Sequence, residues 1–230
     1  MEKKSVVFDI RGDFACFRKF YTNSSILSYP FPPPTVIQGI IASLIGIRPN
    51  RIRSDLQGIE IATIVLSPIR TTMLTINFTD TSETHWDPNK RTQIPVQFLK
   101  KPAYRIFAIG DRESNTLKDI ETVLTTRRNN FHVYLGMANC LAYYEYAFSD
   151  IAIEQDGETS VNSIVPLKEG IRINLDKMEN IHVYKEIVPA ELDNSRKPLR
   201  FVDAVMPVDG KALYVQGKHY KVRKYNVVTF

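Results

Sequence analysis

The sequence is poor in the residues that build disulfides and metal centres. Only two of its 230 residues are cysteines. Cys16 and Cys140 lie far apart and match no C-x-x-C or zinc-ligand spacing, so we interpret them as free thiols. Four histidines, at positions 85, 132, 182 and 219, are scattered without an H-E-x-x-H motif or a His-rich cluster. We therefore expect neither a metal ion nor another cofactor.

Long apolar runs are also missing. No stretch is long enough to span a bilayer, and residues 1–4 (MEKK) lead directly into strand-like sequence instead of a signal peptide. We therefore expect a cytoplasmic protein that does not contact a membrane.

Common enzyme motifs do not occur either. The sequence contains no G-x-S-x-G, Walker loop, G-x-G-x-x-G or paired-carboxylate motif, so we assign no catalytic residue and expect a protein that is not an enzyme. Metal-free RNA cleavage by a general acid and base drawn from His, Lys and Tyr stays open, because any basic RNA-binding protein could assemble such a pair.

The charge balance favours a polyanionic partner. Lys and Arg number 30 and Asp and Glu number 25, which gives a formal net charge of +5 and a pI near 9.1. This excess is modest for the length, and it favours nucleic acid over a membrane surface. A hydrophobic content of 43% is ordinary for a globular protein and allows one large or two small domains.

The order of predicted elements indicates an α+β fold. Alternating or β-branched runs predict strands at 6–11, 59–66, 69–78, 104–109 and 140–148, and apolar periodicity predicts helices at 35–45 and 115–128. With one hairpin partner set aside, this is the βαββαβ plan of a ferredoxin-like (RRM-like) domain, which we place at residues 1–150.

Beyond residue 150 the helical periodicity disappears. Short strand candidates alternate there with Gly, Pro and Asp turns. The strand candidates are residues 163–166, 171–174, 181–188, 201–205, 212–215 and 220–228. We expect a smaller β-rich domain over residues 151–230.

Both predicted helices begin with a capping signal. Prolines at 30 and 32–34 hold the chain extended, and Thr35 with Gln38 then forms a capping box. Ser114 or Asn115 would cap the second helix. The first helix carries a stripe of small residues, Gly39, Ala42, Ser43 and Gly46. We interpret the stripe as a site of close packing, with direct contact to a ligand as the alternative.

Two polar segments are candidates for binding. Residues 79–99 are long for a passive connection, which indicates a projecting arm or binding loop, with a disordered tip as the alternative. Residues 14–25 (FACFRKFYTNSS) mix aromatic, basic and hydroxyl side chains, which can stack bases and hold phosphates. Phe14, Phe17 and Phe20 could equally be core residues, and the pattern alone favours that interpretation.

Several blocks of the sequence resemble a known family. Residues 7–18 (VFDIRGDFACFR), 28–41 (SYPFPPPTVIQGII) and 44–47 (LIGI) resemble the N-terminal signature of the fifth CRISPR-associated subunit family, RAMP-type subunits of type I Cascade complexes. Residues 91–93, 99–106 and 134–136 resemble later blocks more loosely. The match is specific over about the first fifth of the chain and is nearest the I-B-like branch.

The resemblance implies an RRM-like domain with a thumb hairpin inserted at about 79–99. Such a subunit binds the 5′ handle of the crRNA, caps the filament of backbone subunits, contacts the large subunit and meets target DNA only through the complex. It is a non-catalytic part of antiviral defence. Because one branch of the family cleaves precursor crRNA, a metal-independent endoribonuclease is the alternative.

The resemblance also implies which side chains meet RNA. The leading contacts with the handle would be Phe17, Arg18, Lys19, Thr22, Ser24 and Ser25, with Arg11 and Arg105 as secondary contacts. The residues on or near the thumb, facing the guide or a backbone subunit, would be Trp86, Lys90, Arg91 and Gln93.

Overall fold

The structure is a computed structural model, and it describes residues 2–22, 24–79, 91–178, 182–208 and 211–230. The described strands form one six-stranded and three three-stranded sheets. The large sheet has the order β15 (Tyr225–Val227), β14 (His219–Val222), β7 (Ala142–Gln155), β1 (Glu2–Gly12), β6 (Ala103–Gly110) and β3 (Glu60–Val65).

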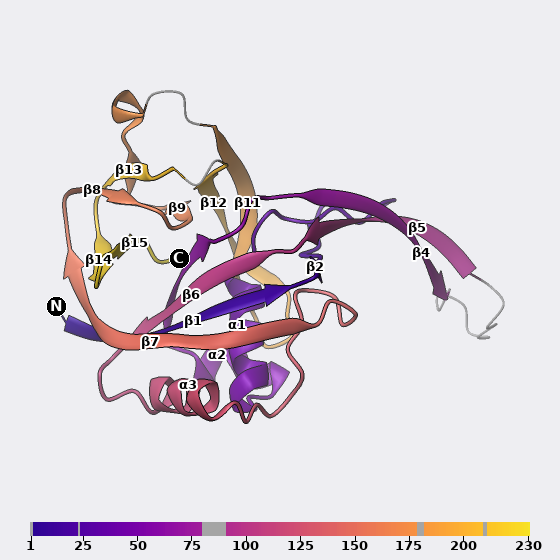
Figure 1. Cartoon of the computed structure of the whole chain (residues 1–230), viewed down its shortest axis with the longest axis horizontal. Coiled ribbons are helices and arrows are strands. Elements are labelled where there is room, and N and C mark those ends of the chain that lie inside the picture. Colours follow the sequence, from indigo (N-terminus) through magenta and orange to yellow (C-terminus); the bar gives the residue numbers. More distant parts are fainter. Residues whose placement is uncertain (1, 23, 80–90, 179–181, 209–210) are drawn as a thin grey trace.

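The small sheets and the helices complete the fold (Figure 1). The small sheets are β2 (Phe14–Ala15), β5 (Arg91–Lys100) and β4 (Thr71–Thr79); β11 (Val183–Leu192), β12 (Pro198–Pro207) and β9 (Val165–Leu167); and β10 (Arg172–Ile173), β13 (Leu213–Gln216) and β8 (Glu158–Val161). The helices are α1 (Pro34–Ile45), α2 (Ile52–Asp55) and α3 (Asn115–Thr126), with 3-10 turns η1 (Pro49–Arg51) and η2 (Leu175–Lys177). The predicted α+β class is confirmed.

The large sheet is covered on both faces. Val6, Phe8 and Ile10 of β1 alternate toward one core, which they share with residues of α1 and α3. Val7 points the other way, into a second core with Phe107 and residues of β14 and β15. Figure 1 shows the helices on one side of this sheet, and most of the C-terminal strands lie on the other. The sequence predicts the alternation of β1 but not the cover over its second face.

The first helix begins one residue earlier than predicted and without the expected cap. Pro33 is the N-cap residue and offers no side-chain hydrogen bond, while Pro34 fills the first helical position. The capping box is wrong, because the Thr35 hydroxyl instead donates to the Pro189 carbonyl oxygen of β11 at 3.4 Å. This contact ties the start of α1 to the C-terminal region.

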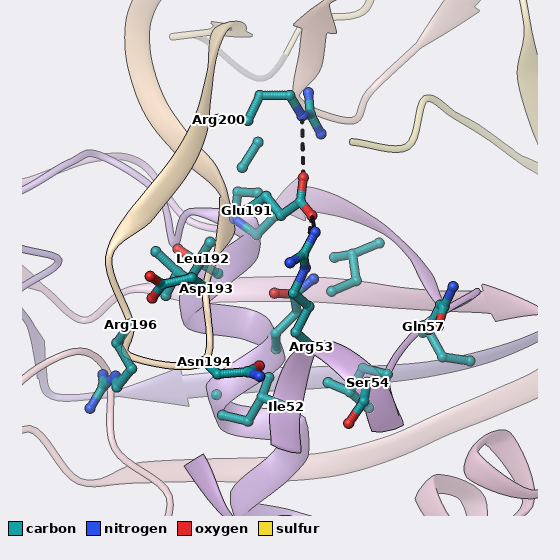
Figure 2. Close-up of a pocket in the computed structure, with 18 of the residues that line it drawn as sticks. Ile52, Arg53, Ser54, Gln57, Glu191, Leu192, Asp193, Asn194, Arg196 and Arg200 are labelled. Carbon is teal, nitrogen blue, oxygen red and sulfur yellow. Dashed lines mark hydrogen bonds and ion pairs between the residues drawn. The ribbon is translucent and has the colours of Figure 1, made fainter. Parts of the chain in front are cut away.

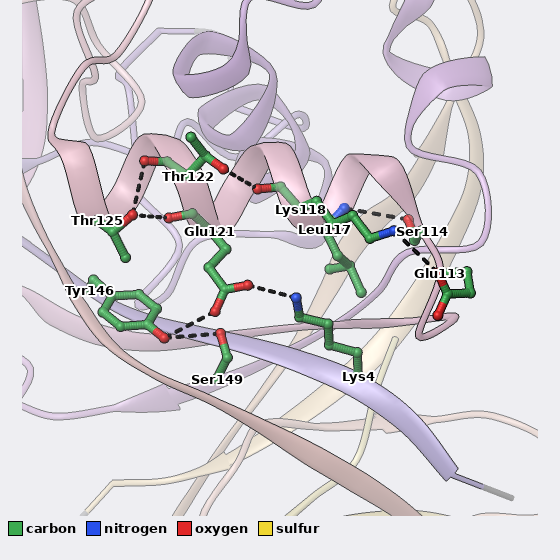
Figure 3. Close-up of polar contacts among 10 residues, drawn as sticks. All are labelled: Lys4, Glu113, Ser114, Leu117, Lys118, Glu121, Thr122, Thr125, Tyr146 and Ser149. Atoms are coloured by element: carbon green, nitrogen blue, oxygen red, sulfur yellow. Dashed lines mark hydrogen bonds and ion pairs between the residues drawn. The ribbon is translucent and has the colours of Figure 1, made fainter.

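The second long helix begins as predicted and is fastened to the sheet. The Ser114 hydroxyl accepts a hydrogen bond from the Leu117 backbone N–H at 3.4 Å. Figure 3 shows Glu121 of α3 between Lys4 of β1, at 2.6 Å, and the Tyr146 hydroxyl of β7, at 3.2 Å. Burial raises the pKa of Glu121, but these bonds outweigh it and hold the pKa below its ordinary value.

A long hairpin leaves the body of the protein. Strands β4 and β5 pair over their whole length, from Thr71 opposite Leu99 to Thr79 opposite Arg91, and Figure 1 shows their far end projecting away from the other elements. Residues 91–99 of the predicted arm at 79–99 thus form the second strand of this hairpin. Residues 80–90 lie outside the described residues.

The C-terminal strands return to the large sheet. The predicted strand at 220–228 is a hairpin, because Arg223 adopts a left-handed turn conformation (φ 53°) between β14 and β15. Glu60 of β3 accepts hydrogen bonds from Tyr220 at 2.9 Å and Thr229 at 2.7 Å, and it pairs with Lys3. The predicted boundary near residue 150 falls inside β7, and the division into two domains stays a prediction.

The stripe of small residues on α1 is not packed at its first position. A Cβ atom added at Gly39 would meet no heavy atom within 4 Å, so close packing is wrong for this residue. Within the described residues, no helix is long and apolar enough to cross a membrane.

We expect Gly39→Ala to stabilise the protein by about 0.5–1 kcal/mol, because glycine is the weaker helix former and the added methyl group meets nothing. Urea denaturation followed by circular dichroism measures this change. Gly136→Ala is the matched control and should destabilise, since Gly136 has φ +88° and its Cβ would lie 1.9 Å from the Cys16 carbonyl oxygen. A lower midpoint for Gly39→Ala would contradict the open helix face.

Candidate nucleic-acid interface

The segment between β2 and α1 folds back on itself and is fixed at its base. The Tyr29 backbone N–H donates to the Phe17 carbonyl oxygen at 2.8 Å, and that of Lys19 donates to Leu27 at 2.8 Å. Ile26 makes two backbone hydrogen bonds with β5. Its N–H donates to the Pro95 carbonyl oxygen at 2.9 Å, and its carbonyl oxygen accepts from the Gln97 N–H at 2.8 Å. These hydrogen bonds fix the base of the loop, and residues 20–22, 24 and 25 extend from it.

Phe17 belongs to the base and not to a binding surface. Its side chain is 1% exposed and packs edge-on against Tyr104, with ring centroids 6.0 Å apart. The backbone N–H of Phe17 donates a hydrogen bond to the Ser28 hydroxyl at 2.9 Å. A buried ring cannot stack on a base, so the expected RNA contact by Phe17 is corrected to support of the loop.

Lys19 and Thr22 also serve the loop itself. The Thr22 hydroxyl is buried and donates to the Lys19 carbonyl oxygen at 3.0 Å. The Lys19 ammonium pairs with Glu186 of β11 and lies 5.7 Å from the ring centroids of Tyr21 and Tyr29. Burial lowers the pKa of Lys19, but the bond with Glu186 outweighs it and raises the pKa above its ordinary value.

The exposed side chains of this loop form a cluster, in which the Tyr21 hydroxyl donates to Glu186 at 3.4 Å. Phe20 and Tyr21 are 52% and 53% exposed, and their rings meet edge-on. Phe201 of β12, 40% exposed, lies against Phe20 with a centroid distance of 4.5 Å. Exposed Arg18 starts the same loop, and its guanidinium donates to the Thr22 carbonyl oxygen at 3.4 Å. We call the exposed cluster of Arg18, Phe20, Tyr21 and Phe201 the aromatic patch.

The aromatic patch was only partly predictable. Ser24 is exposed and Ser25 half-buried in the loop that Arg18 starts. Phe20 and Tyr21 lie within the quoted stretch of residues 14–25, but no periodicity distinguishes them from Phe17. Phe201 is far away in sequence, and no local signal could have placed it here.

The secondary candidates lie elsewhere. Arg105 donates two hydrogen bonds to Asp9, both at 2.7 Å, and a third to Tyr225, so its guanidinium is already engaged. Because Arg105 and Tyr104 are consecutive in β6, their side chains leave opposite faces of the sheet. Phe17 contacts Tyr104, so Arg105 points away from the base of the loop. Arg11 is exposed at the end of β1.

The projecting hairpin carries two of the four candidates expected near the thumb. Arg91 and Gln93 are exposed on β5. Met73 and Leu74 lie on the neighbouring strand β4, and they are 51% and 46% exposed. Trp86 and Lys90 lie outside the described residues.

Two solved structures from CRISPR systems have a similar fold. The chain is similar to a CRISPR protein from Archaeoglobus fulgidus, with a TM-score of 0.60 and 15% identity over 100% of this chain and 99% of that one. It is also similar to a chain of a CRISPR RNA-guided surveillance complex, with a TM-score of 0.54 and 11% identity over 91% of each chain. At these identities, the similarity defines the fold.

A family model gives the identification itself. No curated protein matches this chain. The model described as CRISPR-associated protein (Cas_Cas5) matches residues 5–206, which is most of the chain. The protein therefore belongs to the Cas5 family of CRISPR-associated proteins, and the resemblance found in its sequence is confirmed.

We expect Phe17→Ala to lower the free energy of unfolding by about 3–5 kcal/mol, because it removes a fully buried ring. Phe20→Ala is the matched variant on the same loop. It should change the free energy of unfolding by less than about 1 kcal/mol, since the Phe20 ring is half exposed. Urea denaturation of both variants measures the difference. Equal losses of stability would show that Phe20 is part of the core.

Proposed function

We propose that this protein is a non-catalytic RNA-binding subunit of a type I CRISPR surveillance complex in the cytoplasm. It holds the 5′ handle of the crRNA and caps the filament of backbone subunits in antiviral defence. The observation that carries the proposal is the aromatic patch, which combines exposed rings with a cation on a rigid loop. Family membership and the surveillance-complex fold support it.

The aromatic patch fits single-stranded RNA. Bases splayed out of a strand stack on exposed aromatic rings, and each such stack contributes about 1–3 kcal/mol. Phe20, Tyr21 and Phe201 present three neighbouring rings from two elements. Arg18 and the hydroxyl of exposed Ser24 can meet the phosphates between stacked bases.

The rest of the fold suits a place at the end of a filament. We propose that β7, β1, β6 and β3 with α1 and α3 form a ferredoxin-like, RRM-like domain, and that the β4–β5 hairpin is its thumb. Arg91 and Gln93 would meet the guide or the adjacent backbone subunit. Arg11 would be a secondary RNA contact. The large subunit would be a further partner, and target DNA would be met only through the complex.

The titratable groups beneath the loop are unsuited to acid–base chemistry. Catalytic proton transfer is most efficient when a pKa lies near the working pH. Burial raises the pKa of Tyr29, whose hydroxyl donates to the Ile187 carbonyl oxygen, and Lys19 keeps its proton in the pair with Glu186. These shifts support a binding role over the alternative, a metal-independent endoribonuclease.

We expect Arg18→Ala combined with Phe20→Ala to weaken binding of the guide RNA at least about tenfold, because it removes one stacking ring and one phosphate contact. The measurement is guide RNA retained by the purified assembly at two salt concentrations. Arg112→Ala is the control, because this exposed arginine pairs with Glu2 at the other end of β1.

Two outcomes would contradict the proposal. Unchanged retention in the double variant would remove the aromatic patch from the handle site. A discrete cut after incubation of the purified chain with repeat RNA in EDTA would favour the endoribonuclease.

A further inference from the structure

A second candidate site lies on the other face of the β11–β12 hairpin. Arg200 and Phe201 are consecutive in β12, so their side chains leave opposite faces, with Phe201 in the aromatic patch. On the Arg200 side, α1, α2 and the turn of the hairpin enclose a pocket of about 560 Å³. This volume lies within the range of roughly 300–1,000 Å³ typical of ligand sites. We call it the hairpin pocket (Figure 2).

Three arginines and two carboxylates line the hairpin pocket, namely Arg53, Arg196 and Arg200 with Glu191 and Asp193. Arg53 of α2 pairs with Glu191 at 2.8 Å, and Arg200 reaches the same carboxylate only at 4.0 Å. Figure 2 shows Glu191 between these two guanidinium groups and Arg196 at the turn, apart from both. The Arg196 side chain makes no hydrogen bond or ion pair with a described residue, while its backbone N–H donates to the Asp193 carbonyl oxygen at 3.0 Å. One carboxylate thus serves two arginines, and a third is unpaired.

Asp193 makes no ion pair with the third arginine among the described residues. Its carboxylate accepts hydrogen bonds from the backbone N–H groups of Ser195, at 2.8 Å, and Lys197, at 2.7 Å. It therefore serves to shape the turn. The donors of Arg196 and most of those of Arg200 remain available to an anion from outside the chain.

Uncharged donors with free hydrogen-bonding capacity surround the arginines. The side-chain amides of Gln38, Gln57 and Asn194 line the hairpin pocket, and within the described part of the chain they make no hydrogen bond. Such amides can bond the backbone of an extended peptide. Gly39 adds no side chain to this wall, and its open Cβ position leaves room for a ligand beside α1.

The apolar part of the hairpin pocket is aliphatic. Ile52, Ile59 and Ile61 line it together with Ala190, and Phe230 is its one aromatic lining residue among those described. Single-stranded RNA is recognised largely by rings that stack bases, and half-buried Phe230 is the one ring that the described lining offers. Aliphatic side chains with arginines and amides match a peptide that carries carboxylates and aliphatic residues.

We propose that the hairpin pocket is a docking site for an acidic, aliphatic peptide segment of a partner protein. The carboxylates of the segment pair with Arg196 and Arg200, its aliphatic side chains cover the isoleucines, and its backbone bonds the free amides. The net charge of +5 on this chain favours the approach of an acidic partner. This site is separate from the aromatic patch, so a protein and an RNA strand can be held on opposite faces of one hairpin.

Fluorescence polarisation with a fluorescein-labelled peptide of alternating glutamate and leucine tests the proposal on the full chain. We expect saturable binding that Arg196→Glu with Arg200→Glu weakens at least about tenfold, because attraction becomes repulsion. Gly39→Leu should weaken it similarly by filling the pocket. The charge-reversed control Arg112→Glu should leave the affinity unchanged, as should Arg18→Ala with Phe20→Ala.

Three results would overturn the proposal. The first is no saturable binding of the acidic peptide, and the second is equal affinity in the wild type and both pocket variants. The third is that the pocket variants weaken binding of a single-stranded oligonucleotide but leave peptide binding unchanged. That result would make the pocket a site for RNA phosphates. Because the pocket variants keep the aromatic patch intact, their guide RNA retention reports on the proposed function independently.

Discussion

The hydrophobic core on each face of the central sheet is the constraint on which the rest of the structure depends. Sheets with helices on one face often bind RNA through the other face, where exposed aromatic side chains stack bases. Here Val7 and Phe107 on that second face are fully buried beneath Tyr220 and Val227 of the C-terminal hairpin. The bonds from Tyr220 and Thr229 to Glu60 fasten this cover to the sheet edge. In the proposed function, RNA therefore binds at the periphery, on the loop before α1 and on the projecting hairpin.

The same C-terminal region that closes the sheet also completes the peripheral sites. Glu186 of β11 holds Lys19 in place, and Phe201 of β12 adds a ring beside Phe20. On the reverse side of this hairpin, Glu191 and Arg200 face Arg53 of α2. One two-stranded element thus separates a surface suited to bases from a pocket suited to carboxylates. The β-rich C-terminal region works with the N-terminal elements in both sites.

Local sequence rules predicted the parts of the fold that depend on local physics. The alternation of β1, the Ser114 cap of α3 and the rigid proline segment before α1 all follow from residues close together in sequence. The local predictions were wrong where a side chain contacts a residue that is distant in sequence. Thr35 bonds Pro189 and forms no capping box, and Phe17 is buried against Tyr104 while its neighbour Phe20 meets Phe201. The family resemblance located the loop, but only tertiary contacts show which of its side chains are free.

The central claim is that RNA is held by the aromatic patch and not by the face of the sheet. Ultraviolet crosslinking of the purified ribonucleoprotein, followed by mass spectrometry of the peptides joined to RNA, tests it most directly. We expect crosslinks at Phe20, Tyr21 and Phe201, because their exposed rings can stack on bases. Crosslinks at Tyr143 or Tyr225 on the strands of the large sheet, with none in the loop, would contradict it.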